Sequence, residues 1–188
     1  MADGPETTKQ ILTIPNLLSL FRILLIPLIV WLYCGKGNYP LAAWALVLSG
    51  ITDVADGFIA RRFHMVSDLG KVLDPIADKL TQVTALGCLL TRFPTVCLPL
   101  AVMVVKEAVM AVMGLVVIRR TGAVYSAEWH GKLATCLLYA VIFVHIVWYD
   151  IPRTASLLLA LAGAGGVILS LALYSIRNLR RIKEAGSK

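Results

Sequence analysis

Four aspartates in the first half of the chain have spacings that could support chemistry. Asp53 and Asp56 are three residues apart, and Asp74 and Asp78 are four residues apart. Each spacing places both side chains of a pair on one face of a helix. The segments are joined by a short loop, so they are expected to be antiparallel neighbours whose carboxylates can meet.

Crowded carboxylates repel one another and need a counter-charge. Their oxygens are hard ligands that suit Mg²⁺ or Mn²⁺, and no His or Cys is placed among them to favour zinc. Two such ions can polarise a phosphoryl group and stabilise an attacking oxygen. The pattern therefore predicts a metal-dependent site, and the alternative is a set of helix-capping aspartates with surface partners.

Small residues and one arginine lie between the aspartates. Gly57 follows Asp56 directly, Ala60 lies one turn further on, and Gly70 precedes Asp74 by one turn. Together they leave the helix backbone open to a ligand, and the guanidinium of Arg61 suits phosphate oxygens. These features indicate a diphosphate-bearing substrate, although small residues also let membrane helices pack closely.

The composition defines the kind of protein that must position these residues. Of 188 residues, 59% are hydrophobic and 15% charged, with a mean hydropathy of +0.80 and a net charge of +7. A soluble globular protein has fewer apolar residues and more charges, and a disordered chain is less hydrophobic. The sequence therefore predicts a polytopic membrane protein.

The apolar stretches predict an all-α integral membrane fold with six transmembrane helices, since about 20 apolar residues cross a bilayer. We expect one domain at 15–176, preceded by a polar juxtamembrane segment at 1–14 and followed by a basic cytoplasmic tail at 177–188. The N-terminus lacks the features of a cleaved signal peptide. The four cysteines are expected to be small buried residues. The predicted helices are Pro15–Cys34, Leu41–Arg61, Gly70–Leu90, Pro94–Ile118, Ala127–Trp148 and Thr154–Ile176.

The distribution of Lys and Arg predicts the orientation of the chain. Three connections carry one cation each, namely Lys36, Arg92 and Arg153, and most other cations fall on the opposite side. The richer side is normally cytoplasmic. Both termini and the aspartates are therefore expected to face the cytoplasm, and the basic tail can also contact anionic lipid.

The segment from Asp53 to Asp78 resembles the signature of the CDP-alcohol phosphatidyltransferase family, D-x2-D-G-x2-A-R-x8-G-x3-D-x3-D. All eight fixed positions are present. The opening IPNLLSLFRILLIP and the later HGKLAT are similar to segments of bacterial phosphatidylglycerophosphate and cardiolipin synthases. The resemblance covers most of the chain and implies a dimeric, six-helix CDP-alcohol phosphotransferase fold in the bacterial plasma membrane.

The resemblance also implies roles for individual residues. Asp53, Asp56, Asp74 and Asp78 would bind two divalent cations, Mg²⁺ or Mn²⁺, and Asp78 would also be the catalytic base. CDP-diacylglycerol would donate a phosphatidyl group to an alcohol and release CMP. The residues implied to bind its CDP part are Gly57, Ala60, Arg61 and Gly70.

The acceptor is expected to be glycerol 3-phosphate, which would give phosphatidylglycerophosphate. Phosphatidylglycerophosphate synthases carry an Arg-Glu pair in the fourth helix and another Arg seven residues after the Glu, whereas this chain has Lys106, Glu107 and Gly114. That departure leaves open a cardiolipin synthase-like enzyme with phosphatidylglycerol as acceptor. Candidate acceptor-binding cations are Lys132, Arg119, Arg120, Arg177 and Lys106, with Arg22 and Lys79 as further candidates.

Two alternatives belong to other functional classes. A six-helix transporter would predict an inverted repeat and helices broken near the bilayer midplane, and neither is visible in the sequence. A membrane scaffold without catalytic activity would give no reason for four clustered carboxylates.

Overall fold

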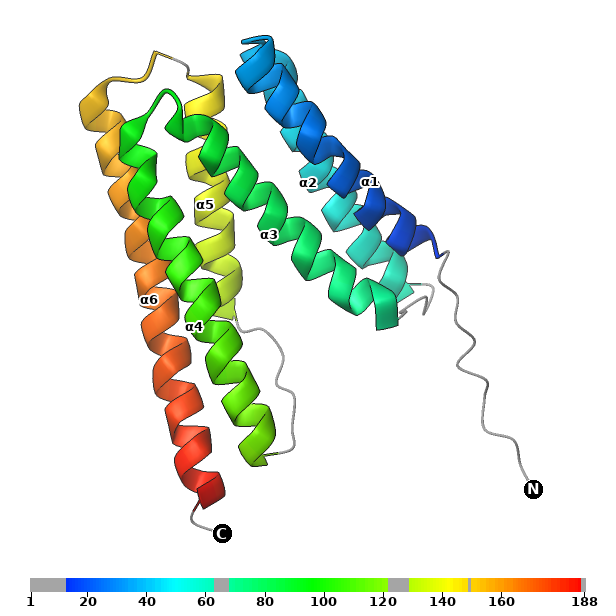
Figure 1. Ribbon diagram of the computed structural model, residues 1–188, viewed down its shortest axis with the longest axis vertical. Coiled ribbons are helices and arrows are strands. Elements are labelled where there is room, and N and C mark those ends of the chain that lie inside the picture. Colours follow the sequence, from blue (N-terminus) through cyan, green and yellow to red (C-terminus); the bar gives the residue numbers. More distant parts are fainter. Residues whose placement is uncertain (1–12, 63–67, 122–128, 149, 187–188) are drawn as a thin grey trace. The chain divides into compact units, whose positions relative to one another are not determined.

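The computed structural model describes residues 13–62, 68–121, 129–148 and 150–186, and every regular element among them is a helix (Figure 1). This confirms the predicted all-α fold, with a long helix at each of the six predicted positions. The helices are α1 (Ile14–Val30), α2 (Tyr39–Arg62), α3 (Asp68–Leu90), α4 (Cys97–Thr121), α5 (Trp129–Val147) and α6 (Arg153–Gly186), with a π-helical turn η1 (Trp31–Gly35) and a 3-10 turn η2 (Pro94–Val96).

The chain divides into two compact units, residues 1–85 and 86–188, with the division inside α3. In the first unit, α1 packs along α2 (Figure 1). The Thr13 side chain accepts a hydrogen bond from the Asn16 N–H at the start of α1. The Asn38 side chain accepts one from the Leu41 N–H at the start of α2, at 3.2 Å. These contacts satisfy backbone donors that a helix start leaves unpaired.

The turn between α1 and α2 contains Gly37, whose φ of +62° lies in the left-handed region that glycine adopts without steric cost. The rings of Tyr33 and Tyr39 meet edge to face across this turn, with centroids 5.0 Å apart. The turn thus fixes how α2 returns along α1. The buried apolar side chains of the pair include Leu25, Ile29, Leu32, Ala42, Ala43 and Leu46.

In the second unit, α6 packs against both α4 and α5 (Figure 1). Glycines permit the close approach of α6 to α5. A Cβ added at Gly163 would lie 3.1 Å from Val141, and one added at Gly166 would lie 2.6 Å from Leu137. Because lipid and protein interiors are similarly apolar, close van der Waals packing at such small residues is what associates membrane helices.

Four described segments are long and apolar enough to cross a membrane: Pro15–Gly35, Pro94–Arg120, Trp129–Val147 and Arg153–Lys183. Helices α2 and α3 are not among them. These two helices carry the four aspartates, together with Arg61, Lys71 and Lys79, and each charge is costly in a bilayer. The prediction of six crossings is therefore supported for four helices, and it stays a prediction for α2 and α3.

The sixth helix differs most from its predicted boundary. It continues to Gly186, ten residues beyond the expected end at Ile176. Residues 177–185 contain neither Gly nor Pro and include Leu, Arg, Lys and Ala, which are strong helix formers. The basic tail therefore extends α6.

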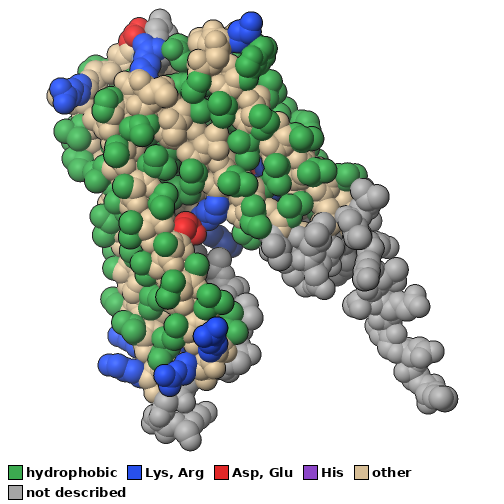
Figure 2. Space-filling view, in the orientation of Figure 1, with side chains coloured by type: hydrophobic (Ala, Val, Ile, Leu, Met, Phe, Trp, Pro, Cys, Tyr) green, Lys and Arg blue, Asp and Glu red, His purple; other side chains and the backbone are tan. Residues whose placement is uncertain are grey.

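Hydrophobic side chains cover much of the visible surface, and Lys and Arg gather near the C-terminal ends of α4 and α6 (Figure 2).

The prediction that all four cysteines are buried was wrong. Cys88 is buried, whereas Cys34, Cys97 and Cys136 are exposed. In membrane helices an apolar side chain gains nothing by turning inward, because lipid is as apolar as the protein core.

Candidate active site

Three helices of the first unit contribute polar side chains to one site. Asp53 and Asp56 come from α2 and Asp74 from α3, as the helical spacings predicted. From α1 come Ser19 and Arg22, which are three residues apart and share one helix face. We refer to the four aspartates, Ser19 and Arg22 as the aspartate site.

Arg22 lies at the centre of the aspartate site and is only 1% exposed. Its Nη1 pairs with Asp53, and its Nη2 donates to Asp56 Oδ2 at 2.9 Å. The same Nη2 lies 3.9 Å from Asp74 Oδ1. One guanidinium thus faces carboxylates from both α2 and α3, and it supplies the counter-charge that buried Asp56 requires.

Ser19 makes a second link between the helices. Its hydroxyl lies 3.4 Å from Asp56 Oδ2 and also makes a close contact with Asp74 Oδ1. The same oxygen lies 3.0 Å from the Pro15 carbonyl, to which it can donate as a hydroxyl does within a helix. Ser19 is fully buried, so α1 holds Asp56 and Asp74 together from within the protein.

Asp78 has its own set of contacts on α3. The Gln82 amide donates to both carboxylate oxygens at 3.2 Å, and Lys79 Nζ lies 3.9 Å from Oδ2. Asp74 and Asp78 both repel the negative charge of Asp53, so Asp78 is electrostatically part of the cluster. The spacing of four residues between Asp78 and Gln82 lets the amide orient the carboxylate.

The carboxylates differ in their access to ligand. The side chain of Asp56 is 3% exposed, whereas those of Asp53, Asp74 and Asp78 are 47%, 39% and 21% exposed. Three of the four aspartates can therefore meet a molecule that enters the site, whereas Asp56 is buried.

Divalent cations are compatible with the site in donor chemistry and charge. Its ligands would all be oxygens, and three carboxylates already converge on one cationic group. In the described part of the chain, however, no three Asp, Glu, His or Cys side chains are arranged closely enough to hold one ion. The carboxylates are instead arranged around Arg22.

The predicted CDP-binding residues can be placed only in part. Gly70 is buried in α3, one turn before Asp74. Gly57, Ala60 and Arg61 belong to α2, but their side chains lie outside the described residues. Their predicted contacts with CDP stay predictions.

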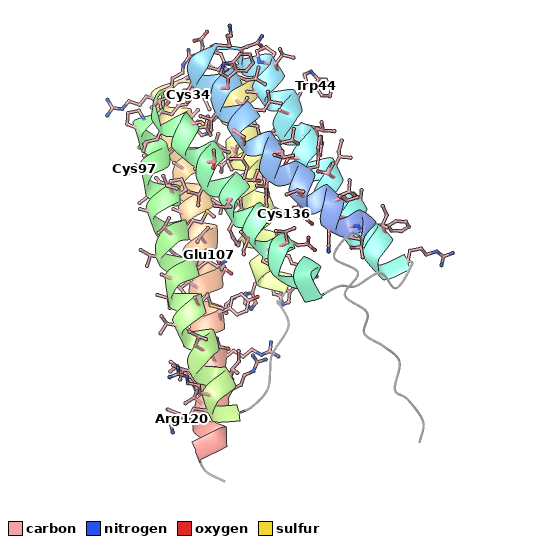
Figure 3. All side chains as sticks on the ribbon, turned by 45° about the vertical axis from the view of Figure 1, so that its right-hand side comes forward. Cys34, Trp44, Cys97, Glu107, Arg120 and Cys136 are labelled. Carbon is pink, nitrogen blue, oxygen red and sulfur yellow. The ribbon has the colours of Figure 1, made fainter. Side chains whose placement is uncertain are left out.

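The predicted acceptor-binding cations belong to the second unit, and four of them are exposed: Arg119 and Arg120 end α4, Lys132 lies in the first turn of α5, and Arg177 is in α6. The fifth, Lys106 on α4, is only 8% exposed and donates to Glu107 at 2.8 Å. Figure 3 shows Glu107 midway along α4 and Arg120 near its end. Arg22 contacts the aspartates, and Lys79 lies beside Asp78.

The sequence interpretation missed the importance of three residues. It gave no role to Ser19 or Gln82, and it considered Arg22 only as an acceptor-binding candidate. A signal was present, because Asn16, Ser19 and Arg22 form a polar stripe with a spacing of three in an otherwise apolar helix. Each of these side chains is less than 5% exposed.

The sequence of the chain is similar to those of known proteins. Residues 12–172 match the model of the CDP-alcohol phosphatidyltransferase family. A cardiolipin synthase (CMP-forming) of Streptomyces coelicolor is 38% identical over 142 residues, covering 71% of this chain and 65% of that protein. The human cardiolipin synthase (CMP-forming) is 36% identical over 121 residues, which are 62% of this chain and 40% of that protein.

A third relative carries a different name. The CDP-diacylglycerol–glycerol-3-phosphate 3-phosphatidyltransferase of Rickettsia typhi is 45% identical over 69 residues, covering 36% of this chain and 39% of that protein. The chain thus spans less than two thirds of the length of each of these relatives.

Proposed function

Because the chain belongs to the CDP-alcohol phosphatidyltransferase family, we propose that it transfers a phosphatidyl group from CDP-diacylglycerol to an alcohol and releases CMP. The observation that carries the proposal is the aspartate site, in which α1, α2 and α3 bring carboxylates around one buried cation. The four long apolar helices support an integral membrane protein, and a diacylglycerol-linked donor would be dissolved in the surrounding bilayer.

In the proposed reaction, Asp78 removes the proton from the acceptor hydroxyl. The hydroxyl oxygen then forms a bond to the phosphorus that carries diacylglycerol, and the bond from that phosphorus to the CMP oxygen breaks. Gln82 orients the Asp78 carboxylate through both of its oxygens. The remaining task of the protein is to hold the two substrates in line, which contributes much of the catalysis in such transfers.

Asp53, Asp56, Asp74 and Asp78 would hold two divalent cations, Mg²⁺ or Mn²⁺. When bound, these ions would polarise the phosphoryl oxygens and offset the charge on the departing CMP. Arg22 and Ser19 would keep the carboxylates together, because both contact Asp56 from within the protein. Gly57, Ala60, Arg61 and Gly70 would bind the CDP part of the donor.

The acceptor that we propose is phosphatidylglycerol, which would give cardiolipin. Two observations support it. The relatives that align over most of the chain are named cardiolipin synthases. On α4, the Lys106 charge is paired with Glu107, and Gly114 has no side chain, so neither position offers a free cation to a small phosphorylated acceptor.

Glycerol 3-phosphate is the second candidate acceptor. The 45% identity to the Rickettsia typhi protein over 69 residues favours it. In that case the exposed cations Lys132, Arg119, Arg120 and Arg177 would bind the acceptor phosphate as predicted. We also propose that the enzyme is a homodimer of a bacterial plasma membrane with its site and termini on the cytoplasmic side.

The test is the release of CMP from CDP-diacylglycerol by the purified chain with Mg²⁺ and either acceptor alone. We expect CMP and cardiolipin with phosphatidylglycerol. Turnover with glycerol 3-phosphate alone would transfer the assignment to the second candidate. No CMP with either acceptor would contradict the proposed function.

A further inference from the structure

A pocket of about 740 Å³ lies at one end of the second unit, where α4 and α6 begin and α5 ends. It is lined by residues of two connections, with Arg92 and Thr95 from the first and Asp150, Arg153 and Ser156 from the second and the start of α6. The predicted acceptor-binding cations Arg119 and Arg120 lie at the far end of α4. The pocket is therefore separate from them within this unit.

Two residues that line the pocket, Thr95 and Ser156, belong to a polar network with buried His145. His145 is fully buried, with Nδ1 2.8 Å from the Val141 carbonyl and Nε2 2.9 Å from Ser156 Oγ. A carbonyl can only accept, so Nδ1–H donates to it, and in the neutral ring Nε2 accepts from Ser156. Ser156 also bonds the hydroxyl of Thr95. This network fixes Ser156 and Thr95, both of which line the pocket.

Arg92 is positioned by its neighbours at the rim of the pocket. Its guanidinium carbon lies 5.7 Å from the centre of the Phe93 ring, and that ring meets His145 edge to face at 5.1 Å. Arg92 also donates to Asp150 at 3.1 Å. The two paired side chains are 33% and 68% exposed, and exposed ion pairs contribute little to stability. A ligand anion can therefore replace the Asp150 carboxylate at Arg92.

Arg153 is the second cation of the pocket and opens α6. Among the residues that the structure describes, Arg153 forms no ion pair. It lies at the start of a 34-residue helix, where the helix dipole and unpaired N–H groups favour an anion. Two arginines against one aspartate leave the pocket with a net charge of +1.

The distribution of cations along the chain makes it unusual that Arg92 and Arg153 line the same pocket. The positive-inside pattern leaves only Lys36, Arg92 and Arg153 on the sparse side of the chain. Two of these three cations line one pocket, although they are separated by 60 residues in the sequence. Orientation of the chain does not require cations here.

We infer that this pocket binds a phosphate group through Arg92 and Arg153. Arginine suits this ligand because its planar fork matches phosphate oxygens. The pocket volume exceeds the size of a single phosphate and falls in the range of small-molecule sites. The phosphate can belong to the head group of an anionic phospholipid or to a free phosphate ion, and the experiment separates these sources.

The experiment measures binding to the purified full chain in phosphate-free detergent buffer, and it does not depend on the proposed transferase activity. One probe is phosphatidic acid, with diacylglycerol as the matched lipid without phosphate, and the other is inorganic phosphate. We expect Arg92→Gln and Arg153→Gln each to weaken phosphatidic acid binding about tenfold, since a charge-assisted hydrogen bond is lost. Lys36→Gln, which removes the third cation of the same side, should leave binding unchanged.

Asp150→Asn tests the same site with the opposite sign. It removes the carboxylate that competes for Arg92, so binding should become several-fold tighter, a gain that misfolding cannot produce. The same pattern with inorganic phosphate alone would assign the pocket to free phosphate. The proposal is overturned if Arg153→Gln affects neither probe more than Lys36→Gln does, or if Asp150→Asn weakens binding.

Discussion

At the scale of single residues, Asp78 is the side chain on which the proposed chemistry depends most. Asp78→Asn keeps the shape of the side chain and an oxygen for Gln82, but the amide cannot accept a proton from the acceptor hydroxyl. We expect CMP release to fall by about 10²–10⁴-fold, the usual contribution of a general base. The melting temperature should stay close to that of the parent protein.

Lys36→Gln is the control for Asp78→Asn. It likewise removes one charge, from an exposed side chain outside both the aspartate site and the pocket of Arg92 and Arg153, and it should retain CMP release. Full activity of Asp78→Asn would refute the role of Asp78 as base.

Arg22 leads to a prediction about stability. Arg22→Gln would leave Asp56 buried without its counter-charge, and breaking a buried pair in this way costs about 3–5 kcal/mol. We expect a clearly lower melting temperature in metal-free buffer. Added Mg²⁺ should raise the melting temperature of the variant more than that of the parent, because a cation that binds only the folded state stabilises it.

Arg92→Gln provides the comparison for Arg22→Gln. It also removes an arginine from an Arg-Asp pair, but that pair is exposed and should contribute little. Arg22 is not the counter-ion of the aspartates if Arg22→Gln has the same melting temperature as Arg92→Gln. The same conclusion follows if Mg²⁺ raises the melting temperature of Arg22→Gln no more than that of the parent.

The aspartate site also shows how far residue patterns can be interpreted. The spacings of three and four residues were enough to place Asp53 with Asp56 and Asp74 with Asp78 on helix faces. The central position of Arg22 could not be predicted, because a polar stripe on α1 indicates a face but not its partner. The contact of His145 with Ser156 likewise depends on how α5 packs against α6.

At the scale of elements, the length of each apolar stretch predicted the six helices because a bilayer-spanning helix needs a fixed number of residues. The end of α6 was predicted ten residues too early, since apolarity ends at Ile176 whereas helix propensity continues to Gly186. Membrane thickness limits the length of the apolar stretch, but it does not limit the length of the helix. The cysteine prediction failed for a related reason, because apolar residues in lipid-facing helices are not drawn inward.

The packing of α6 on α5 gives the prediction at this scale. Gly166→Val would place a Cβ 2.6 Å from the Leu137 side chain, so the two helices must separate or Leu137 must move. Overpacking of this kind costs about 1–3 kcal/mol. We expect a melting temperature several degrees below that of the parent.

Gly165→Val is the neighbouring control, since a Cβ at Gly165 meets nothing within 4 Å. Both variants have the same intrinsic helix propensity, so only the contact differs. Equal melting temperatures for the two variants would mean that α6 does not approach α5 through Gly166.

At the scale of the whole molecule, the cations that give the net charge of +7 include two groups in different places. Most cations lie in the segments that the positive-inside pattern assigns to the cytoplasm, including the C-terminal turns of α6. Two of the cations that do not fit this pattern, Arg92 and Arg153, line one pocket. Orientation and ligand binding therefore use different cations of the same chain.

This separation predicts the orientation of both chain ends. A fluorescent protein that folds only in the cytoplasm, fused after Lys188, should fluoresce in a bacterial host, because Arg177, Arg180, Arg181 and Lys183 hold this end inside. The same fusion inserted at Gly37, in the turn between α1 and α2, should stay dark. The number of crossings is even if α2 and α3 both cross the membrane or if neither does, and an even number leaves both termini on the same side. In either case a fusion before Met1 should therefore fluoresce as well. A dark fusion at either terminus would contradict the orientation on which the cytoplasmic placement of the aspartate site depends.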